Sequence, residues 1–272
     1  MINLLKADLF RVLRTKIVYI SLIIAVVLPL FIALVNGLTE MAVRELEREL
    51  DPNIVFPNGI GDSLLTATFS PLMSFSYIFA VFPVIVIMMD FGNGTLRNKV
   101  IHGYTRHQIY AAHFIITLLH VTAMTLVFAT TNVVSALVLG ISEVPTSLIP
   151  VYLIYYFVGL LGIVLVASIG CSLALALGNA GAIVLTIIGI IFLTNIGSII
   201  GLILQLSEVN NADNFLCFFP SYYIDSLSNY MMYKTEVSID PLHIFGAVFG
   251  VLAIAGAFYA LGTFVFNKRD FK

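Results

Sequence analysis

Six long apolar runs, none of which contains a Lys, Arg, Asp or Glu, constrain this chain more than any other feature of its sequence. A helix needs about 20 apolar residues to cross the hydrocarbon core of a bilayer. Lipid offers no partner to backbone N–H and C=O groups, so each run is expected to form a helix rather than an open strand. The sequence therefore predicts an all-α integral membrane protein, a single transmembrane domain over residues 1–272 with six transmembrane helices. The expected helices are residues 17–38, 69–89, 109–139, 148–177, 181–204 and 242–266.

Composition argues against a soluble domain. The chain is 60% hydrophobic and only 10% charged, whereas soluble domains are about 45–50% apolar and about 25% charged. Cys171 lies in an apolar run and Cys217 in a polar segment, so we expect no disulfide between them and see no metal-ligand spacing. The first apolar run is too long for the core of a signal peptide and is expected to be retained.

The basic residues predict how the chain is oriented. Ten of the 13 Lys and Arg residues lie in the N-terminal stretch, the segment 90–108 and the C-terminal tail. Segments rich in Lys and Arg face the cytoplasm. We therefore expect a multi-pass protein of the cell (plasma) membrane, with both termini and the segment 90–108 on the cytoplasmic side.

Three segments outside the apolar runs have patterns of their own. In residues 3–16, Leu5, Leu9, Val12 and Leu13 follow helical spacing, which predicts an amphipathic helix at the membrane surface; the alternative is a plain extension of the first span. Residues 41–50 look like a short exposed helix after that span. The segment 205–241 is rich in Phe and Tyr and broken by Pro220, which favours a re-entrant element or a loop folded over the bundle end.

Polar side chains follow one face of the third apolar run. His113, Thr117 and His120 are spaced by four and three residues, so they share a helix face. Polar groups in lipid face protein or water, which leaves two interpretations, a substrate path or hydrogen bonding between helices. Further candidates for substrate contact lie in the outer segment before the last span: Phe218, Phe219, Tyr222 and Tyr223.

No motif of catalysis or nucleotide binding is present. The chain has no G-x-x-x-x-G-K-[ST] loop, so we do not expect it to hydrolyse ATP itself. It also has neither a G-x-S-x-G elbow nor an H-E-x-x-H pair. We therefore expect no catalytic residues, no bound metal or cofactor, and no nucleic-acid partner; membrane lipids are the expected surroundings.

The segment 90–107 is a polar island between the second and third apolar runs. Gly92 and Gly94 permit a sharp turn. Thr95 is then expected to cap a short helix that Gly103 ends, and Thr105 to cap the next helix. Such a stiffly attached helix suits the transmission of force from a cytoplasmic partner; a basic loop beside anionic headgroups is the alternative.

The chain resembles the six-span permease subunits of ABC-2-type transporters over almost its whole length. The family pattern has an acid, then Gly-Thr-Leu-Arg-Asn, then Gly-x-x-Arg, then an aliphatic-Tyr pair leading to a Lys. The positions that match it are Asp90, Gly94, Thr95, Leu96, Arg97, Asn98, Gly103, Arg106, Ile109 and Tyr110. Two positions depart from the pattern, because the acid is Asp90 where relatives often have Glu, and His113 stands where the Lys is expected.

This resemblance implies a coupling helix that docks on a separate ABC ATPase subunit, which binds ATP and Mg. It also implies two ATPase copies, a second permease copy that is identical or paralogous, and export of an amphipathic, peptide-like or lipid-like substrate. The subgroup that the chain is most similar to includes bacitracin- and lantibiotic-type permeases of antimicrobial peptide resistance. Two other function classes stay open: an intramembrane enzyme that uses His113 and His120, and an ATP-independent carrier or membrane assembly factor. The residues implied in coupling are Asp90, Gly94, Thr95, Leu96, Arg97, Asn98, Lys99, Gly103 and Arg106.

Overall fold

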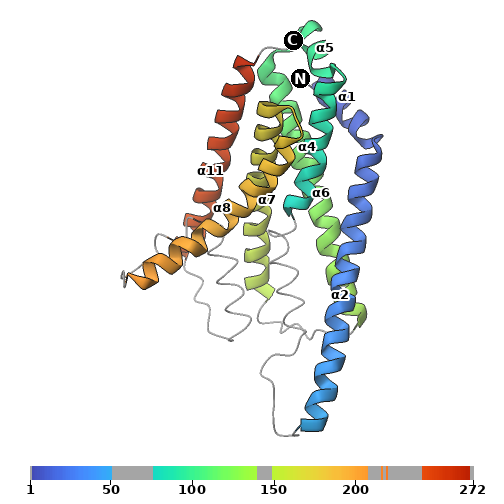
Figure 1. The fold of residues 1–272 in the computed structure, drawn as a ribbon, viewed down its shortest axis with the longest axis vertical. Coiled ribbons are helices and arrows are strands. Elements are labelled where there is room, and N and C mark those ends of the chain that lie inside the picture. The colour runs from blue at the N-terminus through green and yellow to red at the C-terminus, as the bar shows by residue number, and fades with distance from the viewer. Residues whose placement is uncertain are drawn as a thin grey trace.

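Helices account for nearly all of the described chain (Figure 1). The structure is a computed structural model that describes residues 2–50, 76–139, 149–207, 216, 219 and 241–269. Within these ranges there is no β-strand, which confirms the predicted all-α class. The helices are α1 (Ile2–Leu13), α2 (Lys16–Leu50), α4 (Ser76–Gly92), α5 (Thr95–Ile101), α6 (Arg106–Leu139), α7 (Ile149–Leu177), α8 (Gly181–Leu206) and α11 (Pro241–Lys268).

Four of the described helices are long and apolar enough to cross a bilayer, namely α2, α6, α8 and α11. The count rises to five if α4 and α5, which meet at a bend of 66°, form one broken span. Helix α7 has 29 residues, of which Leu161–Leu177 form an apolar stretch. The predicted runs 109–139, 148–177, 181–204 and 242–266 overlap α6, α7, α8 and α11, whereas α2 extends well past the predicted end at residue 38 and residues 69–75 lie outside the described chain. The total of six spans stays a prediction.

The beginning of the chain differs from the sequence-based expectation. Helix α2 continues without a break to Leu50, so the short outer helix expected at residues 41–50 is the end of α2. Helix α1 is separate from α2, because the backbone turns at Arg14 and Thr15, where the Thr15 hydroxyl donates to the Val12 carbonyl at 2.7 Å. The alternative of α1 as a plain extension of the first span is therefore wrong, and its place at the membrane surface stays a prediction.

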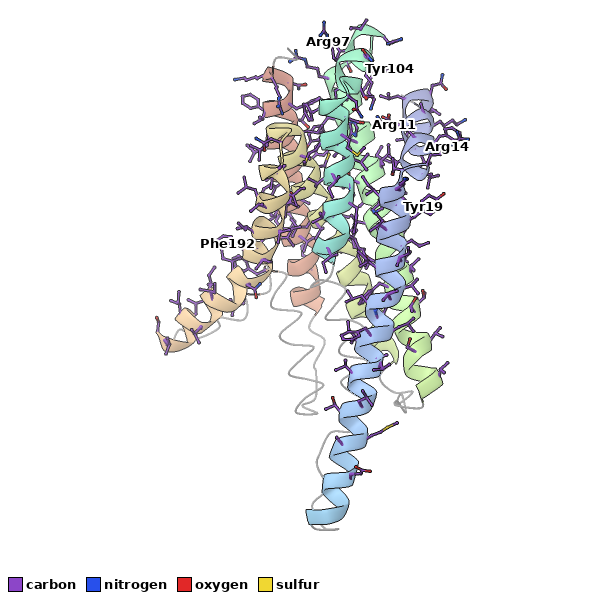
Figure 2. The ribbon with its side chains drawn as sticks, turned by 45° about the vertical axis from the view of Figure 1, so that its right-hand side comes forward. Arg11, Arg14, Tyr19, Arg97, Tyr104 and Phe192 are labelled. Carbon is purple, nitrogen blue, oxygen red and sulfur yellow. The ribbon has the colours of Figure 1, made fainter. Side chains whose placement is uncertain are left out.

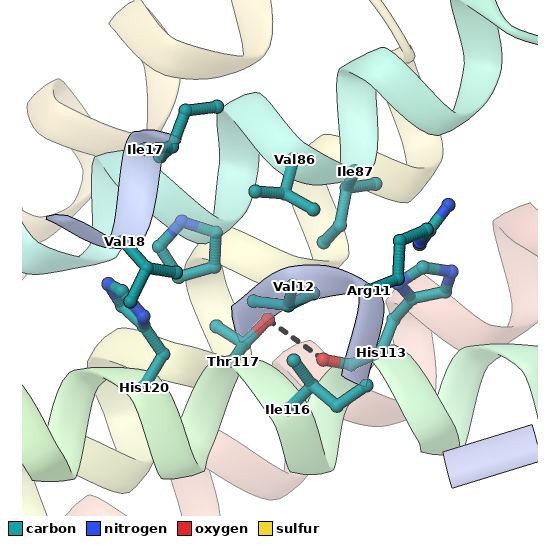
Figure 3. A pocket seen from close by; sticks show the side chains of 11 residues that line it. Arg11, Val12, Ile17, Val18, Val86, Ile87, His113, Ile116, Thr117 and His120 are labelled. Atoms are coloured by element: carbon teal, nitrogen blue, oxygen red, sulfur yellow. Dashed lines mark hydrogen bonds between the residues drawn. The ribbon is translucent and has the colours of Figure 1, made fainter. Parts of the chain in front are cut away.

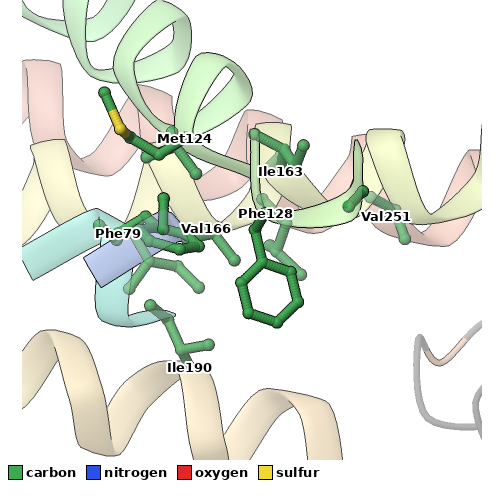
Figure 4. Packing of buried hydrophobic residues seen from close by; sticks show 14 residues of the cluster. Phe79, Met124, Phe128, Ile163, Val166, Ile190 and Val251 are labelled. Carbon is green, nitrogen blue, oxygen red and sulfur yellow. The ribbon is translucent and has the colours of Figure 1, made fainter. Parts of the chain in front are cut away.

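Helix α7 lies at the centre of the bundle. It packs against α4, α6, α8 and α11, as expected for a helix that is apolar all round. Phe79 of α4, Phe128 of α6 and Val166 of α7 meet in the largest apolar cluster (Figure 4). Side chains on the outer faces of α2 and α8 point away from the bundle, as Phe192 does in Figure 2, which suits contact with lipid.

The N-terminus, the C-terminal end of α11 and α5 lie at the same end of the bundle (Figure 1). The tight turn expected after α7 is also there, with Gly178 at φ 60°. Arg269 donates to the carbonyls of Leu175 and Ala176 at 3.0 Å and of Leu177 at 3.1 Å, which joins α11 to the end of α7. The segments predicted to share the cytoplasm therefore share one end of the molecule, while their cytoplasmic placement stays a prediction.

Candidate functional site

The coupling-helix candidate, α5, is set at an angle to α4 by two glycines. Helix α4 ends at Gly92, and Gly94 follows in the left-handed region at φ 67°. Gly94 is the N-cap of α5 and supplies no side-chain hydrogen bond. Thr95 is already the first helical residue, so the expectation that Thr95 caps this helix was wrong. Glycine occupies the cap because a left-handed residue with a side chain is strained there.

Hydrogen bonds at the other end of α5 fix how the chain enters α6. Gly103, at φ 86°, donates to the Val100 carbonyl at 3.0 Å, and Tyr104 donates to the Lys99 carbonyl at 3.2 Å. These two bonds form a Schellman motif, which confirms that Gly103 ends the helix. Thr105 and Gln108 then exchange backbone-to-side-chain bonds of 3.1 and 3.3 Å, a capping box that confirms Thr105 as the cap of α6.

The two faces of α5 differ in exposure. Leu96 and Lys99 are buried, at 1% and 8% exposed. Arg97 and Asn98 are exposed, and Ile101 is 69% exposed. Arg97 stands at the end of the bundle (Figure 2). The helix is thus anchored by its buried face, and its other face is exposed at the end of the bundle.

Beneath α5 lies a buried group of charged and polar side chains, which we call the ionic cluster. Its members come from four helices: Asp8 and Arg11 of α1, Asp90 of α4, Lys99 of α5 and His113 of α6. Arg11 donates through both terminal nitrogens to Asp90, with Nη2 to Oδ2 at 2.6 Å. Lys99 Nζ lies 2.7 Å from Asp8 Oδ2, 3.7 Å from Asp90 Oδ2 and 3.2 Å from His113 Nε2. Asp8, Asp90 and His113 are all less than 5% exposed.

The charges of the ionic cluster balance, because two carboxylates face two cations. Burial by itself would lower the pKa of Arg11, but the hydrogen bond and charge of Asp90 raise that pKa above its ordinary value overall. A buried charge is tolerated when it is paired and hydrogen-bonded in this way. The cluster therefore ties α1, α4, α5 and α6 together at the end where α5 lies.

Several residues assigned to coupling do not face outward. Asp90, Leu96 and Lys99 are buried in the bundle. Arg106 donates to the backbone carbonyl of Asn267, which joins the start of α6 to the end of α11. Among the residues predicted for coupling, Arg97 and Asn98 are the polar side chains on the exposed face of α5.

Sequence reasoning missed Asp8 and Arg11 as members of the site. The available signal was Asp8 itself, the one acid in the basic N-terminal stretch. Asp8 lies four residues after Leu4 and four before Val12, and these three form the buried face of α1. A carboxylate at the centre of a buried face indicates a basic partner on another element.

The polar face of α6 borders a small pocket next to the cluster (Figure 3). His113, Thr117 and His120 line it together with side chains of α1, α2 and α4. Thr117 Oγ1 donates to the His113 carbonyl at 2.8 Å, while His120 Nε2 has no hydrogen-bond partner within the described residues. The cavity volume is about 10 Å³, which is room for about one water molecule. The structure thus brings the three predicted polar residues to one pocket, but leaves no open substrate path there.

The outer candidates are described only in part. Phe218, Tyr222 and Tyr223 lie outside the described residues. Phe219 is described, and its N–H donates to the Leu216 carbonyl at 2.9 Å. Leu216 packs against Gly201 of α8: a Cβ added to Gly201 would lie 3.3 Å from a methyl carbon of Leu216. Within the described part of the chain, no group of three or more His, Cys, Asp or Glu residues could hold a metal ion.

Comparison with known proteins identifies one family. The family model described as ABC-2 family transporter protein matches residues 4–194, which is more than half of the chain. The match spans α1 to α7 and about half of α8, and it includes all members of the ionic cluster. No curated protein matches the chain.

Proposed function

Because the chain belongs to the ABC-2 family of transporter proteins, we propose that it is the permease subunit of an exporter driven by a separate ATPase. Membership makes the chain a multi-pass membrane component of an ABC transporter. The proposal goes further in assigning ATP and Mg to two copies of a partner chain. It also includes a second permease copy, identical or paralogous, and a place in the cell membrane with both termini in the cytoplasm.

The observation that carries the proposal is the two-sided environment of α5. Its inner face is held by Leu96 and by the ion pairs of Lys99, so a force applied to α5 reaches α1 and α4 directly. Its outer face leaves Arg97, Asn98 and Ile101 exposed at the end of the bundle. A helix that is rigidly anchored and exposed on one side is suited to receive motion from a partner docked on it.

Charge reversal on the outer face tests this docking role. Arg97→Glu should weaken copurification with the partner ATPase and reduce ATP-dependent transport at least tenfold, because an interface charge is inverted. Lys6→Glu is the matched control, since Lys6 is an exposed basic residue on α1 away from α5. Arg106 is unsuitable for the test, because its reversal would also break the contact with Asn267. Normal complex formation and transport with Arg97→Glu would reject the docking role.

For the cargo, we propose an amphipathic peptide or lipid-like molecule. The outer faces of α2, α8 and α11 expose large apolar side chains and carry no charge within the spans, which suits a substrate that partitions into the bilayer. A panel of membrane-active peptides, including bacitracin and lantibiotics, tests the assignment in cells with and without the gene. Protection that disappears with Arg97→Glu supports peptide export, and unchanged susceptibility to every peptide would contradict it.

The polar face of α6 supports substrate movement only after a rearrangement. The pocket at His113, Thr117 and His120 holds about one water molecule, so a substrate can pass there only if α1 and α2 move away from α4 and α6. The same small volume weakens the hypothesis of an intramembrane enzyme using His113 and His120, because no substrate fits between them. An ATP-independent carrier is distinguished by transport that persists when the ATPase gene is deleted.

A further inference from the structure

Two basic residues at the corner where α1 meets α2 face away from the bundle. Arg14 belongs to the turn between the two helices, Lys16 begins α2, and both side chains are exposed. Figure 2 shows Arg14 on the outer side of α1, whereas Arg11 lies on the side of the bundle. Neither Arg14 nor Lys16 has an ion-pair partner within the described residues. Their charges are therefore available to a partner outside the chain.

No acid of α1 or of the first half of α2 offsets these two charges on the surface. Asp8 is the one acid among the first 39 residues of the sequence. It is buried, and its Oδ2 lies 2.7 Å from Lys99 Nζ, so its charge is used inside the bundle. The corner is therefore positive on its outer side, which is complementary to an anionic group.

Apolar and aromatic side chains lie beside the two cations. Phe10, Leu13 and Tyr19 are each more than half exposed. The Arg14 guanidinium lies 4.0 Å from the centre of the Phe10 ring, a cation–π contact that holds the charge against this apolar surface. We call Phe10, Leu13, Arg14, Lys16 and Tyr19 the corner face. Cations set among exposed aromatic and aliphatic side chains are typical of a helix that lies at the surface of a bilayer.

Helix α2 continues the corner face with an apolar strip. The candidate span begins at Lys16, which puts Lys16 and Tyr19 at the level of the lipid headgroups, where Tyr is enriched. Ile20, Ile23 and Val27 follow Lys16 at steps of four, three and four residues, so they share its helix face, and all three are exposed. A soluble acidic protein cannot follow this strip into the hydrocarbon core, whereas a phospholipid carries its anionic head above its acyl chains.

We propose that the corner face binds an anionic phospholipid, with the headgroup on Arg14 and Lys16 and the acyl chains along Ile20, Ile23 and Val27. Two cations select an anionic lipid such as phosphatidylglycerol. Phosphatidylcholine binds there less well, because its choline cation is repelled by the same two side chains. The proposal goes beyond the proposed function and depends neither on the ATPase partner nor on which side of the membrane the corner faces.

Fluorescence of a single tryptophan tests the proposal in the full chain. The sequence contains no Trp, so Tyr19→Trp gives a reporter on the corner face without background. The chain is placed in nanodiscs that contain phosphatidylglycerol and phosphatidylcholine in equal amounts. In one preparation the acyl chains of phosphatidylglycerol carry bromine, which quenches nearby tryptophan, and in the other those of phosphatidylcholine do. Quenching by brominated phosphatidylglycerol should be at least about twofold stronger, because the two cations attract its headgroup.

Substitutions decide whether Arg14 and Lys16 cause this preference. Replacing both by Gln in the Tyr19→Trp chain should make quenching by the two lipids equal, and the chain should still fold because neither residue has an ion-pair partner within the described residues. Lys6→Gln is the matched control, since Lys6 is an exposed basic residue earlier in α1, and it should retain the preference. A preference that persists in the double variant, or that Lys6→Gln abolishes, overturns the assignment of the headgroup to Arg14 and Lys16.

A second reporter position separates a lipid site from ordinary contact with the bilayer. Phe192→Trp, on the exposed outer face of the uncharged helix α8, should be quenched equally by the two brominated lipids. Equal quenching at position 19 as well would overturn the selectivity for an anionic lipid. Absence of quenching by either lipid at position 19 would show that protein, such as a second copy of the chain, covers the corner face. The nanodiscs contain no ATPase, so a failure here leaves the docking role of α5 untouched.

Discussion

At the residue scale, Lys99 shows that partners on other helices decide whether a side chain of a short helix is buried or exposed. The sequence groups it with Arg97 as a basic residue of a cytoplasmic segment. In the structure, Lys99 turns inward to Asp8, ninety-one positions earlier in the chain. A lysine that is 8% exposed is tolerated only because this carboxylate compensates its charge.

Lys99→Met removes that cation while keeping a side chain of similar length. Removing one partner of a buried ion pair costs about 3–5 kcal/mol, because the other charge is left uncompensated. The free energy of unfolding, measured by chemical denaturation in detergent micelles, should fall by that amount. Lys6→Met on the exposed face of α1 is the control and should change stability by less than about 0.5 kcal/mol. Equal effects of the two substitutions would contradict the importance of the buried pair.

A second substitution distinguishes the loss of this ion pair from a general loss of packing, by also removing the Asp8 carboxylate that Lys99→Met leaves without a partner. Asp8→Leu in the Lys99→Met background should recover part of the lost stability, since no buried charge is then left without a partner. If the stability losses of Asp8→Leu and Lys99→Met simply add in the double variant, Asp8 and Lys99 do not interact.

At the scale of the elements, α5 was predicted almost completely from local chemistry. Its start after Gly94, its end at Gly103 and the capping of α6 by Thr105 depend on residues within one or two turns. Only the identity of its N-cap was wrong. Local chemistry does not determine which face of α5 is buried, because Asp8 and Asp90, which hold Lys99, come from other helices.

The packing of α11 on its neighbours gives a second prediction at this scale. A Cβ at Gly262 would lie 2.6 Å from Ser172 Oγ and closer still to the Tyr110 hydroxyl. These two hydroxyls are hydrogen-bonded to each other at 2.8 Å, so neither can move freely. Gly262→Ala should therefore lower the free energy of unfolding by about 1–3 kcal/mol, as overpacking does.

Gly256, which precedes Gly262 in α11, is the matched control for this test. A Cβ there would meet no atom within 4 Å, and alanine is favoured over glycine within a helix by about 1 kcal/mol. Gly256→Ala should therefore leave the thermal unfolding temperature unchanged or raise it. A loss of stability as large as that of Gly262→Ala would contradict the close approach of the helices.

At the scale of the whole molecule, one end of the bundle is held together by polar contacts. The ionic cluster joins α1, α4, α5 and α6, Arg106 joins α6 to α11, and Arg269 joins α11 to α7. A movement imposed on α5 therefore reaches most of the bundle through this end. The exposed large apolar side chains of α2 and α8 lie along the length of these helices, from Tyr19 to Met41 and from Val184 to Leu206.

Labelling of single cysteines checks the predicted orientation of this end. Lys6→Cys, His102→Cys and Lys268→Cys, each with Cys171 and Cys217 replaced by serine, should react with an impermeant maleimide in inside-out vesicles but not in intact cells. Met41→Cys, an exposed position near the far end of α2, should show the opposite pattern. Reaction of His102→Cys in intact cells would contradict the predicted orientation, because basic segments are expected to face the cytoplasm.

The sequence by itself determined the class of protein, the limits of most helices and the end at which the termini and α5 meet. These features follow from local rules: an uncharged apolar run must form a helix in lipid, and glycine and threonine end and begin helices in defined ways. Only the tertiary structure decided that Asp8, Arg11, Asp90, Lys99 and His113 form one buried cluster. Contacts between charges far apart in the chain depend on how four helices pack, and no pattern within a single helix specifies that packing. The role of His113 is therefore a property of the assembled bundle: its neutral ring accepts a hydrogen bond from Lys99, where a lysine at the same position would add a third cation.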